Sequence, residues 1–421
     1  MPPMASDQSA VVAVIGLGYI GLPTAAVLAT HGFDVVGVDI NPSTVDAVNR
    51  GKVPFVEPDL EISVAGAVAR GRLRAQSAPP DADVYVVAVP TPFLAGRSAD
   101  LSFIMDAADA IAPMLRGGEL VILESTSPPG TTRLLADRLV SARPDLSFDG
   151  PDPAVAIHVA HCPERVLPGR IMVELVTNDR IVGGLTAEAT ARASALYAVF
   201  CKGKILETDA ETAELAKLVE NAYRDVNIAF ANELSLICDK LDVDVWGLIR
   251  LANHHPRVDI LEPGPGVGGH CIAVDPWFLV SAAPEDARLV RTARNVNDSM
   301  PGHVAERVVR AVKETEAVRV VMLGLSYKAD IDDLRNSPAV AVVEHVASRL
   351  TGIVIDVVEP NVDALPSSLA LCPNVSLVTS AEAEKDDVVV LLVNHAQFAS
   401  LGAEIRSRNI IDMRGAWRAS A

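Results

Sequence analysis

The segment "VVAVIGLGYIG", Val11 to Gly21, determines how the first half of the chain is interpreted. Its leading apolar residues predict a buried strand, and Gly16, Gly18 and Gly21 then form the pattern GxGxxG at the start of a helix. In this context the first two glycines permit a tight turn and the close approach of a pyrophosphate, and the third lets the helix pack on the strand. A glycine-rich turn without a ligand has the same letters, so the interpretation needs a second feature.

That second feature is Asp39, which ends the next Val-rich run, "DVVGVD". In dinucleotide-binding folds an acidic residue follows the glycines by about 20 residues and accepts hydrogen bonds from the ribose hydroxyls. A carboxylate at this position also repels a 2′-phosphate. The first segment therefore predicts a dinucleotide site that favours NAD over NADP.

Short Val- and Ile-rich runs continue to alternate with longer helical patterns over the first half of the chain. We expect buried strands at "DVYVVAV" and "LVILES", and further strands at "AIHVAH" and "RIVGG". The connections are long enough to hold helices, which predicts a parallel, doubly wound α/β sheet. We place this NAD-binding Rossmann domain at residues 1–205.

Residues 211–240 contain no Gly or Pro and carry apolar residues at intervals of three and four. This pattern predicts a single helix about 45 Å long at about 1.5 Å per residue. A helix of that length usually bridges two domains or builds a subunit interface. We expect it to open a central helical domain, residues 206–305, that also contains a glycine-rich loop with a cysteine.

The first pattern returns near the C-terminus, where "RVVMLGLSY" echoes "AVIGLGY" and "IVIDVVEPN" echoes "FDVVGVDIN". Residues 317–421 are therefore predicted to form a second Rossmann-like unit. It keeps only Gly324 of the glycine fingerprint, so we do not expect it to hold a second dinucleotide in the same way.

The bulk composition limits the function classes. Half of the residues are hydrophobic and only 4% are aromatic, which suits parallel strands buried on both faces. The net charge of −18 argues against a nucleic-acid-binding surface. We expect no membrane span, because no apolar run approaches the roughly 20 residues required. The start, "MPPMASDQSA", has no positive region, and the five cysteines have no regular spacing, so we expect no signal peptide and a cytoplasmic location.

The segment "GPGVGGHCIAVDPW", Gly264 to Trp277, contains the strongest candidate nucleophile, Cys271. Glycines before it leave room for a ligand and expose backbone N–H groups that favour a thiolate. A thiolate beside a nicotinamide can attack an aldehyde, after which loss of a second hydride gives a thioester that water hydrolyses. Asp275 could order that water or interact with Lys217; it could equally be an ordinary helix-start carboxylate. Cys201, Cys238 and Cys372 are interpreted as small core residues.

Other candidates lie at strand ends and on the long helix. "VPTP" and "ESTSPPGTT" place Thr91 and Thr126 at the carboxyl edge of the sheet, where such folds bind ligands, although each is also an ordinary turn or cap residue. Lys217 and Asn221 are four residues apart on one helix face, with Arg224 near the same stripe. "HCPERVLPGR" adds Glu164 and Arg165.

A metal site is not expected near the "HCPER" segment. His158 and His161 face opposite sides of a strand, and no second ligand pair has zinc spacing.

Taken in order, the motifs resemble those of the UDP-glucose/GDP-mannose dehydrogenase family over nearly the whole chain. The shared motifs are "GLGYIGLP", "VPTP", "EST.P.GTT", "PER", "K...N", "GPGVGGHC...D" and "GLSYK....DLR.SP". The resemblance implies an NAD-dependent enzyme that oxidises the C6 alcohol of a nucleotide sugar to a carboxylate in two hydride transfers. It also implies that the second Rossmann-like unit binds the UDP portion and that the long helix pairs two subunits in a homodimer.

Within the family, "PERVLPG", "ANHHPRV" and "GPGVGGHCIAVDPWF" are most similar to the bacterial branch that oxidises UDP-N-acetyl-D-mannosamine. Members acting on UDP-glucose carry "PEF" followed by a further glutamate, whereas here Arg165 replaces that Phe and Pro168 stands where the second Glu would fall. This favours an N-acetylated sugar. Enzymes for UDP-N-acetyl-D-glucosamine share the Arg form, so that substrate and UDP-glucose stay as alternatives.

The resemblance implies a role for each matching residue. Cys271 matches the nucleophile, Lys217 and Asn221 match residues that stabilise or polarise the reacting oxygen, and Asp275 matches the supporting acid. Glu164 and Thr126 complete the expected catalytic set. The expected cofactor contacts are Gly16, Gly18, Tyr19, Ile20, Gly21, Asp39, Thr91 and Thr126. The expected substrate contacts are Glu164, Arg165, Val166, Lys217, Asn221, Arg224, His255, Arg257, Gly268, Tyr327, Lys328 and Arg335. Several of these are cations, as a diphosphate ligand of an acidic chain requires.

Two other function classes remain open from the sequence. A two-electron 3-hydroxyacid dehydrogenase also joins a Rossmann domain to a long-helix domain, but it needs neither Cys271 nor a second Rossmann-like unit. A non-catalytic nucleotide-sugar sensor on the same scaffold would bind the sugar without reducing NAD.

Overall fold

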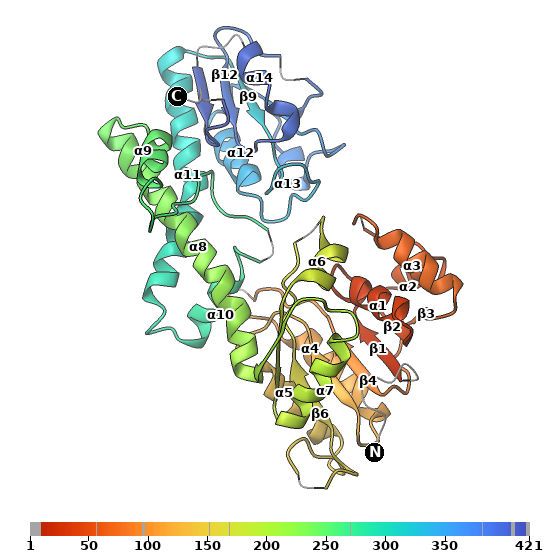
Figure 1. Ribbon diagram of the computed structural model, residues 1–421. Helices are drawn as coiled ribbons and strands as arrows, with labels where there is room; N and C mark the ends of the chain where they lie inside the picture. The colour runs from red at the N-terminus through yellow and green to blue at the C-terminus, as the bar shows by residue number, and fades with distance from the viewer. Residues whose placement is uncertain are drawn as a thin grey trace. The chain divides into compact units, whose positions relative to one another are not determined.

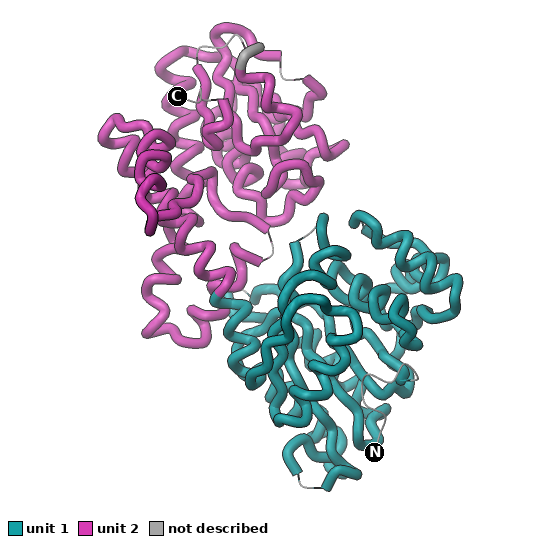
Figure 2. Tube along the Cα trace, viewed as in Figure 1, with its two compact units in different colours: residues 1–219 teal, residues 220–421 magenta. Residues whose placement is uncertain are grey.

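The computed structural model describes residues 10–55, 57–94, 97–150, 152–167, 169–269, 271–380, 382–405 and 409–417. The chain divides into two compact units, residues 1–219 and 220–421, which Figure 2 shows in separate colours. Each unit is built around its own sheet, which is parallel except for one strand pair in the first unit (Figure 1). The α/β class with two Rossmann-like domains and a helical middle, predicted from the sequence, is confirmed.

The first unit holds an eight-stranded sheet in the order β3-β2-β1-β4-β5-β6-β7-β8. All neighbouring strands are parallel except β6 and β7, which are antiparallel. The predicted runs became β1, β2, β4, β5, β6 and β7; β3 and β8 were not predicted. Their bounds are β1 (Val11–Ile15), β2 (Asp34–Val38), β3 (Leu73–Gln76), β4 (Val84–Val87), β5 (Leu120–Leu123), β6 (His158–His161), β7 (Arg180–Gly184) and β8 (Ile205–Asp209).

Helices cover both faces of this sheet, and the alternation of side chains along each strand explains why. In β1, Val12 and Val14 belong to one buried cluster, whereas Ala13 and Ile15 belong to the cluster on the opposite face. Both faces are therefore buried, as a parallel sheet requires. The helices are α1 (Gly21–Thr30), α2 (Pro42–Asn49), α3 (Leu60–Ala69), α4 (Ser102–Ile111), η1 (Ala112–Met114), α5 (Thr131–Ala142), α6 (Ile171–Thr177) and α7 (Ala187–Tyr197).

The predicted long helix is α8 (Ala210–Leu241), 32 residues without a break. Within the second unit it is followed by α9 (Val245–Ala252), α10 (Asp275–Ala282) and α11 (Arg288–Thr315). The described part of the chain contains no helix long and apolar enough to cross a bilayer.

A buried polar chain joins α8 to α11 inside the second unit. Asp225 and Arg294 are 0% and 1% exposed, and Arg294 Nη1 lies 2.5 Å from Asp225 Oδ1. Asn297 Nδ2 donates to the same Oδ1 at 2.8 Å. Asn232 Nδ2 in turn donates to Asn297 Oδ1 at 2.8 Å, and its Oδ1 accepts the N–H of Gly264 at 2.9 Å. The start of the glycine-rich loop is thus tied to the long helix.

The C-terminal sheet has the order β11-β10-β9-β12-β13, and every pair in it is parallel. Val320 and Met322 of β9 pack with α11 and α12, while Val321 and Leu323 face a smaller cluster on the other side. The elements are β9 (Arg319–Leu323), α12 (Pro338–Arg349), β10 (Val354–Val358), α13 (Ser367–Ala370), β11 (Val375–Leu377), β12 (Val388–Leu391), η2 (Ala396–Phe398), α14 (Leu401–Glu404) and β13 (Asn409–Asp412).

Candidate active site

The glycine pattern between β1 and α1 forms an open turn. Gly16 has φ +95°, and a Cβ on it would lie 2.6 Å from the carbonyl oxygen of Ala88. A Cβ on Gly21 would lie 1.9 Å from the carbonyl oxygen of Gly16, so only glycine allows α1 to start so close to the turn. By contrast, a Cβ on Gly18 would meet nothing within 4 Å. This free space at the helix N-terminus suits the approach of a pyrophosphate.

Asp39 follows β2 directly and turns its carboxylate toward the glycine turn. Oδ2 accepts the N–H of Leu17 at 2.9 Å, and Oδ1 accepts the N–H of Asn41 at 2.8 Å. The side chain is half-buried, which leaves part of the carboxylate for a ligand. The Tyr19 ring stacks on Phe55 with the centroids 4.2 Å apart, and Ile20 precedes α1. Asp39 and the residues of the glycine turn, which are predicted to contact a dinucleotide, therefore lie together.

Thr91 and Thr126 lie beyond the carboxyl ends of the adjacent strands β4 and β5. The Thr91 hydroxyl donates to the carbonyl oxygen of Thr126 at 2.7 Å. Both residues are partly exposed. The two residues thus lie in contact at the edge where doubly wound sheets bind ligands, and their part in ligand binding stays a prediction.

Behind that edge lies a buried cluster of charged side chains. Arg180 Nη2 is 2.9 Å from Glu164 Oε2, and both side chains are less than 9% exposed. Arg180 also lies over the ring of Tyr197, 4.6 Å from its centroid. Glu124 accepts hydrogen bonds from the Tyr197 hydroxyl at 2.8 Å and the Thr24 hydroxyl at 3.1 Å. Glu164 was predicted from the sequence, whereas Glu124 and Arg180 were not. Nothing in the sequence around a strand indicates which distant charged residue its own charged residue will contact.

Burial makes the contribution of this cluster to protein stability depend on pH. Desolvation, reinforced by the nearby negative charge of Glu164, raises the pKa of Glu124 from 4.5 to about 7, although Arg180 opposes the shift. A raised carboxyl pKa contributes stability that is complete below pH 4.5 and lost as the pH rises through 7. Burial alone lowers the pKa of His161 to about 3.

We therefore expect Glu124→Gln to flatten the pH dependence of stability. Between pH 5 and pH 8 the wild-type protein should lose roughly 2 kcal/mol of unfolding free energy through this group, and the isosteric amide should not. Urea titrations of both proteins at the two pH values, followed by far-UV circular dichroism, measure the difference. Because His161 is common to both proteins, its contribution cancels. Equal losses in the two proteins would contradict a protonated Glu124.

Glu214, in the first turns of α8, is a further residue that the sequence did not reveal. Its Oε2 accepts the N–H of Gly130, and its Oε1 accepts both the N–H and the hydroxyl of Thr132, all at 2.6 Å. It thus satisfies the free N–H groups at the start of α5, next to the Thr126 segment. In the sequence it is indistinguishable from a solvent-exposed helical glutamate.

Cys271 lies in the turn just before α10 and is exposed, whereas Cys162 and Cys238 are buried. Its carbonyl oxygen accepts the N–H groups of Val274 and Asp275 at 3.0 and 2.9 Å, which ties the turn to the helix. Asp275 is the first residue of α10 and is 3% exposed. Its Oδ2 accepts a hydrogen bond from Asn221 Nδ2 of α8 at 2.5 Å. The turn that carries Cys271 is therefore bonded to the start of α10, and Asp275 is bonded to α8.

The glycines before Cys271 have a different structural reason from the predicted one. We expected them to clear room for a ligand. Instead, a Cβ on Gly268 would lie 2.6 Å from the carbonyl oxygen of Asn336 and 2.8 Å from Tyr327 Cβ. Gly269, with φ +84°, would place its Cβ 2.9 Å from the Tyr327 ring. These glycines let the cysteine loop pack flush against the loop after β9.

Lys217 and Asn221 are one turn apart on α8, and both are buried. Arg224 follows on the same stripe and is exposed. Farther along the chain, His255 and Arg257 lie after α9 and are also exposed. After β9, Tyr327 is half-buried and Lys328 is exposed, while Arg335 pairs with Asp333 at 2.7 Å. Arg165 donates to the carbonyl oxygen of Asp179 in the first unit, where Val166 packs on the core.

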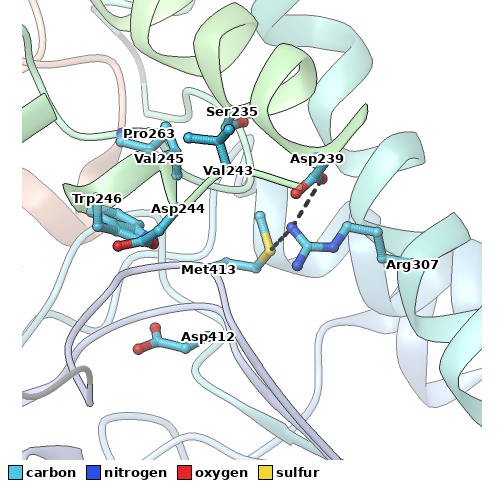
Figure 3. A pocket seen from close by; sticks show the side chains of 10 residues that line it. All are labelled: Ser235, Asp239, Val243, Asp244, Val245, Trp246, Pro263, Arg307, Asp412 and Met413. Atoms are coloured by element: carbon cyan, nitrogen blue, oxygen red, sulfur yellow. Dashed lines mark hydrogen bonds and ion pairs between the residues drawn. The ribbon is translucent and has the colours of Figure 1, made fainter. Parts of the chain in front are cut away.

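A separate pocket of about 50 Å³ lies in the second unit between α8, α9 and β13. Figure 3 shows Arg307 reaching toward Asp239 and Met413, at 3.3 Å from Asp239 Oδ2 and 3.7 Å from Met413 Sδ. Asp244 and Asp412 cap local backbone N–H groups. The polar side chains are thus engaged locally, and none of the predicted site residues lines the pocket.

A dinucleotide turn, an exposed thiol beside a fixed Asn–Asp pair and a second Rossmann-like unit are the features of a nicotinamide-dependent dehydrogenase. Family models agree with this class. Those of the UDP-glucose/GDP-mannose dehydrogenase family match over residues 10–201 for the NAD binding domain, 211–299 for the central domain and 321–419 for the UDP binding domain. The chain belongs to this family, as the motifs predicted.

The relatives found cover nearly the whole chain. An NDP-N-acetyl-D-galactosaminuronic acid dehydrogenase from Ralstonia nicotianae is 54% identical over 97% of this chain and 96% of its own. A UDP-N-acetyl-D-mannosamine dehydrogenase from Yersinia pestis is 53% identical over 97% of this chain and 99% of its own. The solved structure of a UDP-D-ManNAc dehydrogenase from Pyrococcus horikoshii matches with a TM-score of 0.85 at 39% identity, over 96% of each chain.

Proposed function

We propose that this protein oxidises the C6 alcohol of UDP-N-acetyl-D-mannosamine to the carboxylate, with two NAD molecules reduced per sugar. The observation that carries the proposal is the exposed Cys271, which follows glycines packed on Tyr327 and precedes Asp275, the partner of Asn221. A two-electron oxidation needs no nucleophile, whereas conversion of an aldehyde to an acid through a thioester does. Relatives named for UDP-N-acetyl-D-mannosamine support the choice of sugar.

The proposed mechanism divides the work among the chain's own residues. NAD, when bound, supplies the hydride acceptor for both oxidations. In the first, the alcohol proton leaves the C6 oxygen with help from Lys217, and Asn221 polarises that oxygen. The Cys271 sulfur then adds to the aldehyde carbon, and oxidation of this thiohemiacetal gives a thioester. Water breaks the carbon–sulfur bond, which releases the carboxylate and returns the thiol.

Supporting residues then act on proton transfers and on the water. Asp275 accepts from Asn221 and keeps its amide oriented. Glu164, paired with Arg180, is proposed as the group that orders the hydrolytic water in concert with Thr126. Arg165 and Val166 are proposed to contact the sugar.

The UDP portion requires cations and a flat apolar surface. Lys328 and Arg335 after β9, Arg224 on α8 and Arg257 after α9 supply exposed charge, while Tyr327 supplies a ring. Gly268 and His255 complete the proposed contacts. Charge-assisted hydrogen bonds from such side chains are the usual means of holding a diphosphate. The match to a UDP binding domain over 321–419 supports this assignment.

NAD is proposed as the cofactor, held by Gly16, Gly18, Tyr19, Ile20, Gly21, Thr91 and Thr126, with Asp39 selecting against NADP. The free space at Gly18 and the inward carboxylate of Asp39 fit the pyrophosphate and the adenosine ribose. We expect Asp39→Ala to shift the kcat/KM ratio of NAD to NADP by about tenfold or more toward NADP. Steady-state kinetics with both cofactors measure the ratio; an unchanged ratio would remove Asp39 from cofactor choice.

A substrate panel tests the proposed reaction. UDP-N-acetylmannosamine should give two NADH per sugar with no free aldehyde, and faster than UDP-N-acetylglucosamine or UDP-glucose. The Ralstonia relative at 54% identity supports UDP-N-acetylgalactosamine as the second candidate, so that sugar belongs in the panel. One NADH per sugar would instead favour a two-electron dehydrogenase, and binding without NADH would favour a sensor.

A homodimer through α8 and a cytoplasmic location complete the proposal. Tyr223, Phe230, Ile237 and Leu241 are all more than 40% exposed and lie on one stripe of this helix. Four large apolar side chains in one stripe exceed what a monomer usually leaves in water. Sedimentation velocity should show a dimer, and Phe230→Glu should dissociate it.

A further inference from the structure

The C-terminal unit repeats the dinucleotide turn of the first unit. Gly324 follows β9 with φ +92°, as Gly16 follows β1 with φ +95°. Glu359 comes directly after β10, as Asp39 comes after β2. Each carboxylate accepts the N–H of the residue after that glycine, at 2.7 Å from Leu325 and 2.9 Å from Leu17.

The two turns differ in what meets the carboxylate. Glu359 Oε2 also accepts from Ser326 N–H and from His395 Nε2, both at 3.0 Å. Its Oε1 accepts the N–H of Asn361 at 3.0 Å and the Asn361 side-chain amide at 3.2 Å. The side chains of Glu359 and His395 are both 0% exposed. The position beside the carboxylate that is proposed for a ribose hydroxyl in the first unit is therefore filled here by the protein's own imidazole.

The hydrogen bonds also fix the tautomer of His395. The N–H of Asp330 points at Nδ1 from 2.9 Å, and Asn361 Nδ2 lies 3.1 Å from the same atom. Nδ1 must therefore accept, which puts the ring proton on Nε2, where it donates to Glu359. These bonds from His395 and two backbone N–H groups lower the pKa of Glu359 to about 2, although burial raises it. The Asp330 carboxylate lies 3.7 Å from Nδ1.

His395 follows β12, yet its contacts fix a loop that lies far away in the sequence. Nδ1 holds Asp330 at one end of the 326–330 segment, and Ser326 Oγ, 3.3 Å from Nε2, donates to the carbonyl oxygen of Lys328 at 2.6 Å. Tyr327 and Lys328 project from this segment, and the Tyr327 ring packs on Gly269 in the loop of Cys271.

We propose that His395 is a positioning residue that fixes the Tyr327–Lys328 loop for the nucleotide part of the substrate. This inference rests on the proposed function, because it assigns the loop to UDP. Where the first unit has a carboxylate proposed to bind ribose, the second has an internal Glu359–His395 pair, which holds a loop in place for a different nucleotide contact.

The test uses three substitutions at His395 and direct binding of UDP to the full-length protein. Asn places an oxygen near the Nδ1 position, so it retains an acceptor for the Asp330 N–H. Gln places an amide near Nε2, so it retains a donor for Glu359. Ala removes both. His345→Ala is the matched control, because His345 is an exposed histidine on α12 of the same unit.

Calorimetric titration with UDP should give a Kd about tenfold higher for Ala and for Gln than for wild type, and near wild type for Asn. The KM for the UDP-sugar should rise in parallel while kcat stays within about threefold, a split that general destabilisation does not produce. Ser326→Ala, which removes the hydroxyl bond to Lys328, should raise the Kd in the same direction.

Three outcomes would overturn the proposal. If Ala binds UDP as tightly as wild type, His395 has only a structural role. If Gln restores binding and Asn does not, the Asp330 contact does not fix the loop, and the route from Nδ1 through Asp330 to Tyr327 and Lys328 is wrong. If the wild-type protein binds no UDP, the proposed function fails together with this inference, which separates that failure from the other two.

Discussion

Cys271→Ser should abolish formation of the carboxylate, with overall kcat reduced by about 10³-fold or more. The reason is chemical: the proposed nucleophile is a thiolate, and a serine hydroxyl in the same turn stays protonated at neutral pH. The backbone bonds from Val274 and Asp275 to the carbonyl oxygen of residue 271 do not involve the side chain, so the turn should keep its shape. NADH production and product analysis by mass spectrometry measure the effect.

The control for this prediction is Cys372→Ser. That cysteine is half-buried against the C-terminal core and donates to the carbonyl oxygen of Ser368. Its replacement should leave kcat unchanged. Two NADH per sugar from the Cys271 variant at an undiminished rate would exclude a covalent role for this thiol. One NADH per sugar instead of two, with aldehyde trapped by a hydrazine reagent, would show that the variant is blocked after the first oxidation.

Asp225→Leu should reduce the unfolding free energy of the second unit by about 3–5 kcal/mol, because it leaves the guanidinium of Arg294 buried without its principal partner. Burial raises the pKa of Asp225 and Arg294 opposes that rise, so the two charges depend on each other. The chain's three tryptophans, Trp246, Trp277 and Trp417, all lie in this unit. Urea unfolding followed by tryptophan fluorescence therefore reports on it selectively.

Asp298→Ala provides the matched control, since Asp298 pairs with the same guanidinium but is 36% exposed. Its loss should cost less than about 1 kcal/mol. Adding Arg294→Met to Asp225→Leu should recover much of the lost stability, because an apolar pair needs no compensation. If Asp225→Leu and Asp298→Ala lower the unfolding free energy by the same amount, the burial of Asp225 is not the source of the effect.

The strands, the long helix and the cofactor turn could be predicted because each has a local signal. Apolar runs mark β1 and β9, unbroken periodicity marks α8, and Gly16 and Asp39 lie at fixed positions after strands. The similarity between the N-terminal and the C-terminal Rossmann-like units can also be recognised directly in the sequence. Such features depend on residues close together in the chain, which is the information that one sequence contains.

The buried polar contacts could not be predicted, because their partners are brought together only by the fold. Arg180 meets Glu164 across antiparallel neighbours of a sheet, and His395 meets Glu359 across two strand ends. In the sequence each is an ordinary polar residue after or within an apolar run. The glycines before Cys271 were predicted to leave room for a ligand, which was wrong in part because they pack against Tyr327. The sequence around these glycines does not indicate that contact.

The tight seating of Gly268 and Gly269 on Tyr327 has a consequence for protein engineering. No methyl group fits between the two loops at Gly268 or Gly269. The sequence of each loop therefore depends on that of the other, and both must be exchanged together. A chimera that imports the last hundred or so residues of a homologue, in order to change which nucleotide is accepted, should import that homologue's 264–271 segment as well. A graft that respects domain boundaries but separates these two loops should displace the Cys271 sulfur.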